Sequence, residues 1–400
     1  MRKKIVFAGL LFFTAMLLNA QKADSLADNL YFNSAEKLLR TKGNLKIGGY
    51  GGVHYNQPLS SELRNNGKLD VHRFILMMGY QFNDRTQVVT ELEYEHVKEI
   101  YVEQAFLQYK LSRAVNLRAG LILTPMGIVN EYHEPTVFNG VERPLIDHDI
   151  VPSTWREIGL GINGLVLPLS LKYQAYLMNG FNSFDGQAQI GGASGLRGGR
   201  QKGAESFVSA PNVTAKVEYF GIRGLNLGLS GYLGETQSTL YNGIDKNNPA
   251  ALSKADSSVV NLAMLGADGR YSYKGFKLSA QLYYAGLSNT RQYNEFTSNK
   301  GGGDLGSSFF GYYVDVAYNV LRNASTNNQL VPFVRYSNFD THHSVTGIAK
   351  NKAYQNDVIT SGLSWFLDKG AVLKADVQWV KDGLSSEYAT SFNAGFGVMF

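Results

Sequence analysis

The 400-residue sequence contains no cysteine and only 3 tryptophans. The absence of cysteine excludes the small secreted domains that disulfides hold together. After residue 20, no uninterrupted apolar run approaches the ~18–20 residues that a membrane-spanning helix needs. The mature chain is therefore either soluble in the periplasm or crosses a membrane as strands, which a large closed barrel achieves without disulfides.

A large net charge is also missing. The chain carries 38 basic and 33 acidic side chains, and the 3 basic ones before residue 5 belong to an expected signal peptide. Its removal leaves 35 basic against 33 acidic side chains. This balance gives no basic footprint of the kind that nucleic-acid-binding proteins show, so no nucleic-acid partner is expected.

The first 20 residues have the pattern of a secretory signal peptide. Arg2, Lys3 and Lys4 precede an apolar run from Ile5 to Leu18, and cleavage is expected after Ala20. The run is too short for a membrane anchor. Residues 21–44 do not alternate like strands, and we interpret them as a periplasmic lead-in segment with short amphipathic turns before the barrel.

The composition that is present favours strands. Glycine accounts for 43 residues, and tyrosine and phenylalanine together for 46, a mixture typical of sheets with amphipathic aromatic rings. From Leu45 onward, segments of about 10–12 residues alternate apolar and polar side chains. Val213, Ala215 and Val217, for example, interleave with polar neighbours. This period of two places one face toward lipid and the other toward water.

Sixteen such segments predict an all-β, antiparallel transmembrane barrel over residues 45–400. Short connections alternate with long ones, as periplasmic turns and external loops do in bacterial outer-membrane barrels. An even number of strands leaves both ends of the barrel in the periplasm. The predicted strands lie at 45–55, 70–82, 86–97, 100–110, 114–124, 155–167, 169–179, 211–220, 224–235, 258–273, 275–286, 308–320, 330–339, 356–367, 371–381 and 388–400.

The hairpin that turns at residues 83–85 predicts a register. Arg73 should lie opposite Glu95 with both side chains inward, and Phe74 opposite Tyr94 with both outward. A slip of one residue would place Arg73 beside an outward aromatic ring, so the alternation favours this pairing.

The connection at 125–154 holds the candidate site. By strand count it is the third external loop, which we expect to fold inward, and its four prolines limit its backbone freedom. Three interpretations stay open: a pore constriction with a transverse field, a metal site that includes two histidines, or charges that only satisfy one another. Its charged residues are Glu131, His133, Glu134, Glu142, Arg143, Asp147, His148 and Asp149.

Inward-facing positions of the wall supply a second group of charges. Basic and acidic residues nearly balance there, so the lumen is expected to be charged and wet and not a ladder of one sign. The wall residues expected to line it are Arg73, Glu91, Glu93, Glu95, Arg118, Lys172, Arg270 and Arg335. None of the 7 histidines stands in a hydrolase context, so neither an enzyme nor a cofactor is expected.

Four stretches resemble the phosphate-selective porin O and P family in the version common in Bacteroidetes-type bacteria. They are Gly48 to Asn56, Asn130 to Pro135, Val141 to Pro144 and Ile150 to Glu157. The resemblance implies an outer-membrane porin with general or anion-favouring diffusion, often a homotrimer. Phosphate selectivity does not follow, because the family's anion channels have arginine-rich and lysine-rich pores and this lumen is mixed.

The sequence therefore predicts a passive channel of a Gram-negative outer membrane, with lipid, small polar solutes and ions as partners. Two alternatives stay open. One is a substrate-specific uptake receptor, which a lumen-filling 21–44 segment would favour. The other is a structural or secretion-associated barrel.

Overall fold

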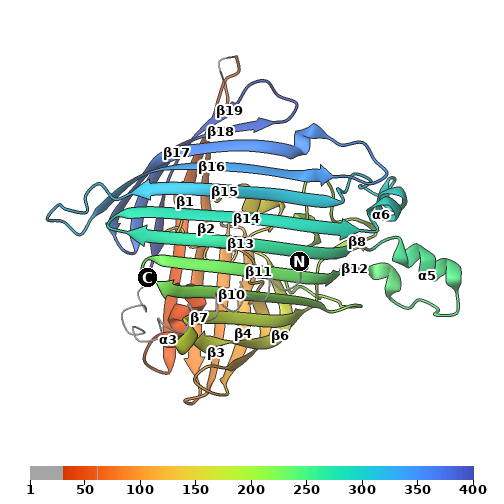
Figure 1. The fold of residues 1–400 in the computed structure, drawn as a ribbon, viewed down its shortest axis with the longest axis horizontal. Coiled ribbons are helices and arrows are strands. Elements are labelled where there is room, and N and C mark those ends of the chain that lie inside the picture. The colour runs from red at the N-terminus through yellow and green to blue at the C-terminus, as the bar shows by residue number, and fades with distance from the viewer. Residues whose placement is uncertain (1–29, 61) are drawn as a thin grey trace, which may run out of the picture.

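The computed structural model describes residues 30–60 and 62–400. The expected signal peptide and the first part of the lead-in segment lie outside these residues. In the described part, sixteen antiparallel strands form a closed barrel in which the first strand, β1, pairs with the last, β19 (Figure 1). The predicted fold class and the sixteen predicted strands are confirmed, with ends that differ by a few residues.

The barrel strands follow the chain as a meander in which each strand pairs with the next. Their bounds are β1 Leu45–Leu59, β2 Lys68–Gln81, β3 Thr86–Glu95, β4 Glu99–Lys110, β5 Asn116–Leu123, β6 Arg156–Val166, β7 Leu171–Met178, β10 Asn212–Ile222, β11 Leu225–Glu235, β13 Asn261–Tyr273, β14 Phe276–Ser288, β15 Ser308–Tyr318, β16 Gln329–Ser344, β17 Gln355–Asp368, β18 Ala371–Asp382 and β19 Ala389–Met399.

The distribution of exposure is that of a barrel with an apolar outer face. In β10, Val213 and Val217 are 48% and 44% exposed, whereas Lys216, which points to the opposite face of the strand, is buried. Charged side chains therefore face inward and aliphatic ones outward, the reverse of a water-soluble fold. None of the helices within residues 30–60 and 62–400 is long and apolar enough to cross a membrane.

The predicted register of the first hairpins is confirmed, since Arg73 pairs with Glu95 and Phe74 with Tyr94. Among the register shifts of the described strands, two β-bulges lie close to this hairpin, in β2 and β4. Gly52 pairs with Arg73 but Val53 pairs with Val71, so His72 is the extra residue of β2. A bulge adds one residue to one strand and re-aims its side chain, and it is frequent next to functional sites.

The second bulge lies in β4. Glu91 pairs with Gln104 but Leu92 pairs with Val102, which leaves Glu103 as the extra residue. Val102 is 41% exposed on the outer face, whereas Glu103 and Gln104 are both buried inside. The bulge therefore turns two successive polar side chains inward, which strict alternation forbids.

Several long connections carry secondary structure of their own. A small sheet joins β8 (Asn182–Asp185) to β9 (Gln187–Ala188) and β12 (Gln237–Ser238). Helices α5 (Pro249–Asp256) and α6 (Thr290–Thr297) lie at the same end of the barrel, on the right in Figure 1. We call this end, which carries the long connections, the loop end, and the opposite end the turn end.

Helix α3 (Ser34–Arg40) lies at the turn end and packs on the inner wall. Asn33 and Glu36 form a capping box that starts the helix. The Leu38 side chain contacts the wall where β1 and β2 carry Gly48 and Gly79. A Cβ on Gly79 would lie 3.2 Å from it, closer than an ordinary van der Waals contact, so this position makes room for the helix.

The interior also contains an apolar core. This differs from the predicted lumen, which was expected to be charged and wet throughout. Trp155 is fully buried, and its ring centroid lies 4.5 Å from that of Phe181 and 4.7 Å from that of Tyr232. Residues from the connection between β5 and β6, from the long connections and from the inner face of β11 to β17 complete this cluster. Part of the barrel at the loop end is therefore packed like the interior of a soluble protein.

Candidate functional site

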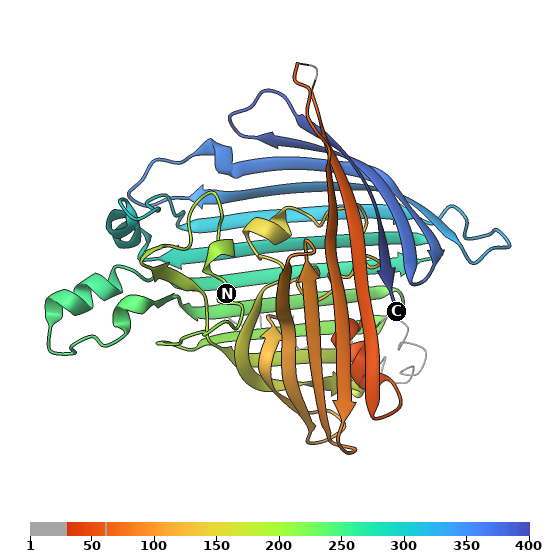
Figure 2. The ribbon, with the colours of Figure 1, turned by 180° about the vertical axis from the view of Figure 1, so that it is seen from behind.

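The segment between β5 and β6 contacts inward-facing side chains of the opposite wall. Asn139 Nδ2 donates to Asp315 Oδ1 of β15 at 2.6 Å, and the backbone N–H of Val141 donates to Asp376 Oδ2 of β18 at 2.7 Å. Lys374 Nζ donates to two backbone carbonyls of the segment at 2.7 and 2.8 Å. In Figure 2 the segment (yellow), which contains α4 (Ile146–Asp149), overlaps the barrel.

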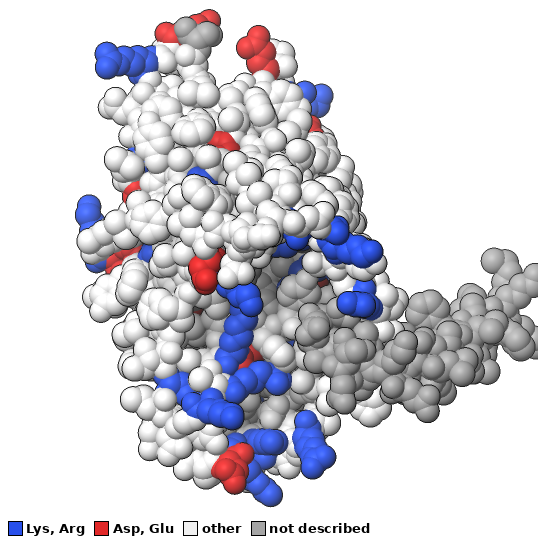
Figure 3. All heavy atoms as spheres, turned by 90° about the vertical axis from the view of Figure 1, so that its left-hand side faces the viewer, with Lys and Arg blue, Asp and Glu red and all other residues white. Residues whose placement is uncertain are grey.

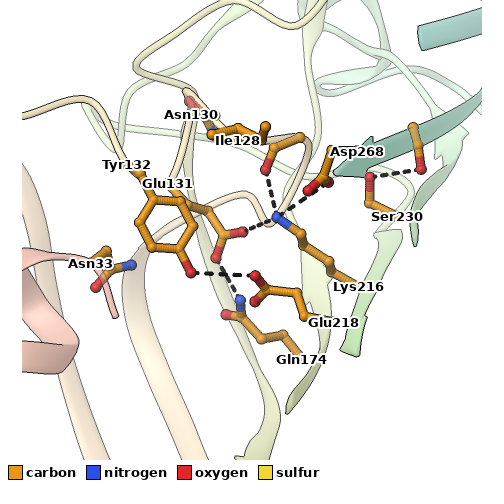
Figure 4. Close-up of polar contacts among 12 residues, drawn as sticks. Asn33, Ile128, Asn130, Glu131, Tyr132, Gln174, Lys216, Glu218, Ser230 and Asp268 are labelled. Atoms are coloured by element: carbon orange, nitrogen blue, oxygen red, sulfur yellow. Dashed lines mark hydrogen bonds and ion pairs between the residues drawn. The ribbon is translucent and has the colours of Figure 1, made fainter. Parts of the chain in front are cut away.

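A buried lysine of β10 holds the beginning of this segment (Figure 4). Lys216 Nζ donates to the carbonyl of Gly127 at 2.5 Å and to Glu131 Oε2 at 2.7 Å, and lies 3.7 Å from Asp268 Oδ2. The other Glu131 oxygen accepts from Gln174 Nε2 at 2.5 Å. All three charged groups are buried, so the lysine neutralises two carboxylates that water cannot solvate.

His133 ties the middle of the segment to β1 and β4. Its Nδ1 lies 3.0 Å from the carbonyl of Asn130, which can only accept, so Nδ1 carries a proton. Its Nε2 lies 2.8 Å from the Tyr50 hydroxyl and 3.3 Å from Glu103 Oε1. The Tyr50 hydroxyl donates to Glu91 Oε1 at 2.6 Å, so Nε2 also donates and the ring is an imidazolium.

The electrostatics of His133 agree with this assignment. Burial alone would lower its pKa, but the charge and the hydrogen bond of Glu103 outweigh burial and raise the pKa of the imidazole. Glu91, Glu103 and His133 could in principle ligate a metal ion, yet the Tyr50 hydroxyl lies among their ligand atoms. The geometry is that of a hydrogen-bonded ion pair that fixes the segment to the wall.

Asp147 lies against the other side of the barrel. Its Oδ1 accepts from Gln281 Nε2 at 2.8 Å and from the Tyr283 hydroxyl at 3.0 Å, while its Oδ2 has no hydrogen-bond partner. Burial is the dominant effect and raises the pKa of this carboxyl group to about 7. Asp147 therefore changes charge near neutral pH.

Glu142 and Arg143 face a cavity on the loop-end side of the segment. Glu142 Oε1 accepts from His54 Nδ1 and from Asn56 Nδ2, each at 3.0 Å. Burial would raise the pKa of Glu142, but the hydrogen bond from His54 outweighs it and holds the pKa at about 2. Burial, with nearby Arg73 second, lowers the pKa of Arg143 to about 10.

The remaining charged residues of the segment lie apart from one another. Glu134 accepts from the backbone N–H of Ser34 at 2.7 Å, which joins the segment to α3. His148 is 52% exposed in its side chain and lies 2.5 Å from Asp149 Oδ1. The structure places His133 and His148 in different clusters, so the two histidines of the segment do not share a site.

The wall residues expected inside do point inward, and most have partners. Arg73 lies 3.3 Å from Glu93 and 3.8 Å from Glu95, and Glu91 accepts from Gln104 at 2.6 Å. Arg118 donates to Gln108 Oε1 at 2.7 and 3.1 Å. These contacts leave a wall of paired charges.

The other wall charges bind the segment or α3. Lys172 lies 2.8 Å from Glu36 of α3 and 3.2 Å from Glu218. Arg270 lies 3.0 Å from Glu218, and its guanidinium stacks 4.3 Å from the Tyr132 ring. Arg335 donates to two backbone carbonyls of the segment, each at 3.3 Å.

Sequence reasoning missed Tyr50 and Glu103. The inward position of Glu103 was not predicted, because a bulge interrupts the alternation at that point. The two adjacent polar residues Glu103 and Gln104 are the signal that could have indicated the bulge. Tyr50 looks like an ordinary aromatic of a strand, and only the tertiary structure shows that its hydroxyl meets three polar groups.

Three of the cavities along the described interior border the segment or α3. One of ≈180 Å³ lies at the loop-end side and is lined by His54, Arg73, Glu142 and Arg143, among others. One of ≈370 Å³ on the other side of the segment is lined by residues that include Tyr132 and Arg335. Phe138 and Pro144 line both, so the segment separates the two cavities at these side chains.

The third cavity, of ≈470 Å³, lies at the turn end beside α3. Basic side chains outnumber acidic ones in its lining, and Figure 3, which faces this end, shows more Lys and Arg than Asp and Glu there. The basic residues are Arg40, Arg85, Lys110, Arg113, Arg118 and Lys172, and the acidic residues are Glu36 and Asp84.

Comparison with curated proteins identifies a relative. An uncharacterized protein of Aquifex aeolicus (strain VF5) is 31% identical over 358 residues, which cover 86% of this chain and 77% of the relative. The chain belongs to the same family as this protein. No family model matches the sequence.

Solved structures with the same fold include bacterial porins and channels at low sequence identity. The outer membrane channel DcaP of Acinetobacter baumannii has a TM-score of 0.59 at 12% identity, covering 90% of this chain and 99% of its own. An anion-selective porin from Comamonas acidovorans has a TM-score of 0.55 at 12% identity, covering 89% and 99%.

Salmonella typhi OmpF, solved with daunomycin, has a TM-score of 0.54 at 12% identity and covers 90% of this chain and 98% of its own. These similarities show the fold. Together with the closed sixteen-strand wall and its apolar outer face, they make this chain a porin-fold β-barrel of the outer membrane.

Proposed function

We propose that the protein is a passive diffusion channel for small hydrophilic solutes or ions, with the 125–154 segment as its constriction. The observation that carries the proposal is the position of Phe138 and Pro144 between two interior cavities. A solute that passes from one cavity to the other along this route must pass these side chains. Their polar surroundings favour hydrated solutes over apolar ones.

The segment is anchored well enough to act as a fixed filter. Lys216 of β10 and Lys374 of β18 bind it from two parts of the wall, and its own His133 binds Tyr50 of β1 at a third. A constriction with fixed geometry selects by size, whereas a mobile loop would not.

Planar-bilayer recording of the refolded protein tests the proposal. The Phe138→Ala change removes a ring from the narrow part, and deletion of residues 129–149 removes most of the constriction. Both should raise the single-channel conductance, the deletion more. Leu240→Ala, in a long connection outside the cavities, is the matched control and should leave conductance unchanged. If Phe138→Ala and the deletion both leave conductance at the wild-type value, the segment is not the constriction.

We further propose that the channel favours anions, as the resemblance to the phosphate-selective porin O and P family implies. The basic lining of the turn-end cavity supports this preference, since six basic side chains face two acidic ones there. Fixed positive charge concentrates anions at a mouth and repels cations. Reversal potentials in a KCl gradient should indicate chloride over potassium, and substituting phosphate for chloride tests the finer selectivity.

A homotrimer is the proposed assembly. Vibrio cholerae OmpT, described in its trimer form, has a TM-score of 0.52 to this chain at 11% identity. Chemical crosslinking in detergent should give a three-subunit band, and a single-subunit mass by light scattering would contradict the trimer.

One observation favours a second candidate, a substrate-specific uptake receptor with a plug. Residues 31–40 lie inside the turn end, where Lys172 binds Glu36 and the carbonyl of Tyr31. The Arg270 guanidinium lies 3.8 Å from the Tyr31 ring centroid. A receptor would conduct poorly until this segment is removed, whereas a porin conducts with the segment in place.

A further inference from the structure

A cluster of metal-ligating side chains lies at the loop end, outside the contacts described so far. Within the described residues, Asp70, His72 and His96 offer one ligand atom each, and these atoms all lie within 4.8 Å of one another. Asp70 and His72 belong to β2, and His96 follows the end of β3 in the hairpin to β4.

Two local departures from regular strand geometry bring the three side chains together. The bulge in β2 makes His72 the unpaired residue, so Asp70, His72 and Arg73 all avoid the outer face, whereas Val71 is 42% exposed on it. His96 has a left-handed backbone with φ 52°, which is uncommon for a residue other than glycine. This conformation turns the hairpin back so that the His96 ring meets Asp70.

The distances are near those that a metal ion requires. His96 Nδ1 lies 2.6 Å and His72 Nδ1 3.7 Å from the same oxygen, Asp70 Oδ2. Ligands of a tetrahedral ion at about 2.1 Å lie about 3.4 Å from one another. The three atoms therefore reach such positions through side-chain shifts of roughly 1 Å, well within rotamer adjustment and without movement of the strands.

The ligand set selects a class of ion. Two imidazole nitrogens and one carboxylate oxygen suit Zn²⁺, Cu²⁺ or Ni²⁺, whereas Ca²⁺ and Mg²⁺ prefer oxygen ligands alone. The side chains of Asp70, His72 and His96 are 13%, 25% and 39% exposed, so the cluster is open to solution. Three protein ligands leave a fourth position for water, as in open zinc sites.

The cluster is connected to the proposed constriction through the histidine ring of His54. The His72 ring stacks on the His54 ring with centroids 4.5 Å apart and planes 15° from parallel. His54 in turn lies 3.0 Å from Glu142 of the 125–154 segment, and both histidines line the loop-end cavity. An ion held by His72 would add two positive charges beside that cavity.

The competing interpretation is an ion-pair network without a metal. Lys68 Nζ lies 3.8 Å from Asp70 Oδ2, and the Lys68 side chain is 69% exposed. An exposed pair of this kind contributes little and leaves the carboxylate free for a stronger partner. An ion-pair network without a metal also does not require the Nδ1 atoms of both His72 and His96 to face the same oxygen, Asp70 Oδ2.

We propose that Asp70, His72 and His96 form a binding site for one transition-metal dication of the Zn²⁺ class at the loop end of the barrel. Ion binding at this site does not require the channel activity proposed above. Its occupancy would stiffen the junction between β2 and the β3–β4 hairpin, because one ion bonds to both.

Calorimetric titration of Zn²⁺ into the full-length barrel, folded in detergent and free of affinity tags, tests the site. We expect one equivalent to bind. His96→Gln and His72→Gln should each weaken binding at least about 100-fold, because each removes one of three ligands. His343→Gln, an exposed histidine outside the cluster, is the matched control and should bind like the wild type.

Electron paramagnetic resonance of bound Cu²⁺ gives a second readout that counts nitrogen ligands. Two nitrogens are expected in the wild type and one in His96→Gln, whose half-exposed side chain can be replaced without disturbing the fold. The absence of stoichiometric Zn²⁺ binding, or equal binding by wild type and His96→Gln, would overturn the proposal.

Discussion

Replacing Lys216 by methionine is the sharpest test of how the 125–154 segment is held. Lys216 is fully buried and binds Glu131 and the carbonyl of Gly127, with Asp268 nearby. The change keeps most of the side-chain volume but leaves two buried carboxylates without their cation. Removing one partner of a buried ion pair costs about 3–5 kcal/mol. At about 1.4 kcal/mol per factor of ten, the detached fraction of the segment rises between about 100- and 4,000-fold.

Hydrogen exchange of the backbone amides of residues 126–134, followed by mass spectrometry, measures this detached fraction directly. Exchange there should speed up by the same factor, while exchange in the β14–β15 hairpin stays at the wild-type rate. The double variant Lys216→Met/Glu131→Gln should recover part of the protection from exchange, because it also removes one of the two buried carboxylate charges that lack a cation. Lys246→Met, an exposed lysine in a long connection, is the matched control. Wild-type exchange in Lys216→Met would refute the anchoring role.

Three further predictions concern stability and conductance. The pKa of Asp147 rises from 3.8 in the unfolded chain to about 7 through burial, so the folded barrel keeps a proton that the unfolded chain loses. Its contribution to the free energy of unfolding should fall as pH rises from about 4 to 7, and Asp147→Asn should flatten the denaturant midpoints over this range. Trp155→Ala should lower the free energy of unfolding by about 3–5 kcal/mol, since it leaves a cavity in the apolar core, whereas an unchanged midpoint would argue against that packing. Deleting residues 30–41 should raise single-channel conductance, because it uncovers the basic cavity; equal conductance would exclude a plug.

The alternation of side chains was sufficient to predict the sixteen strands and the pairing of Arg73 with Glu95. The reason is local: a residue in a half-solvated strand faces either lipid or the interior, and its neighbour faces the other side. Connection lengths likewise showed which end of the barrel carries the long loops. Charged residues such as Lys172 and Arg270 could be assigned to the inner face from their position in this alternation alone.

Counting fails where a bulge inserts a residue. After the outward Val71 and Val102, strict alternation places His72 and Glu103 inward and their successors Arg73 and Gln104 outward. The extra residue in each bulge turns Arg73 and Gln104 inward as well. A bulge depends on how the partner strand pairs, which a single strand's pattern does not reveal. The adjacent polar pairs at 72–73 and 103–104 show only that the alternation is interrupted.

The sequence by itself determined the barrel, the register of its β2–β3 hairpin and which charges face its interior, because these follow from a two-residue period and from the need to pair every backbone group in a membrane. Only the tertiary structure decided what those charges bind. The contacts of Tyr50 with His133, and of Lys216 with Glu131, join residues 83 and 85 positions apart. The apolar core around Trp155 likewise depends on chain segments that meet only after the barrel closes, and no local pattern encodes such a meeting.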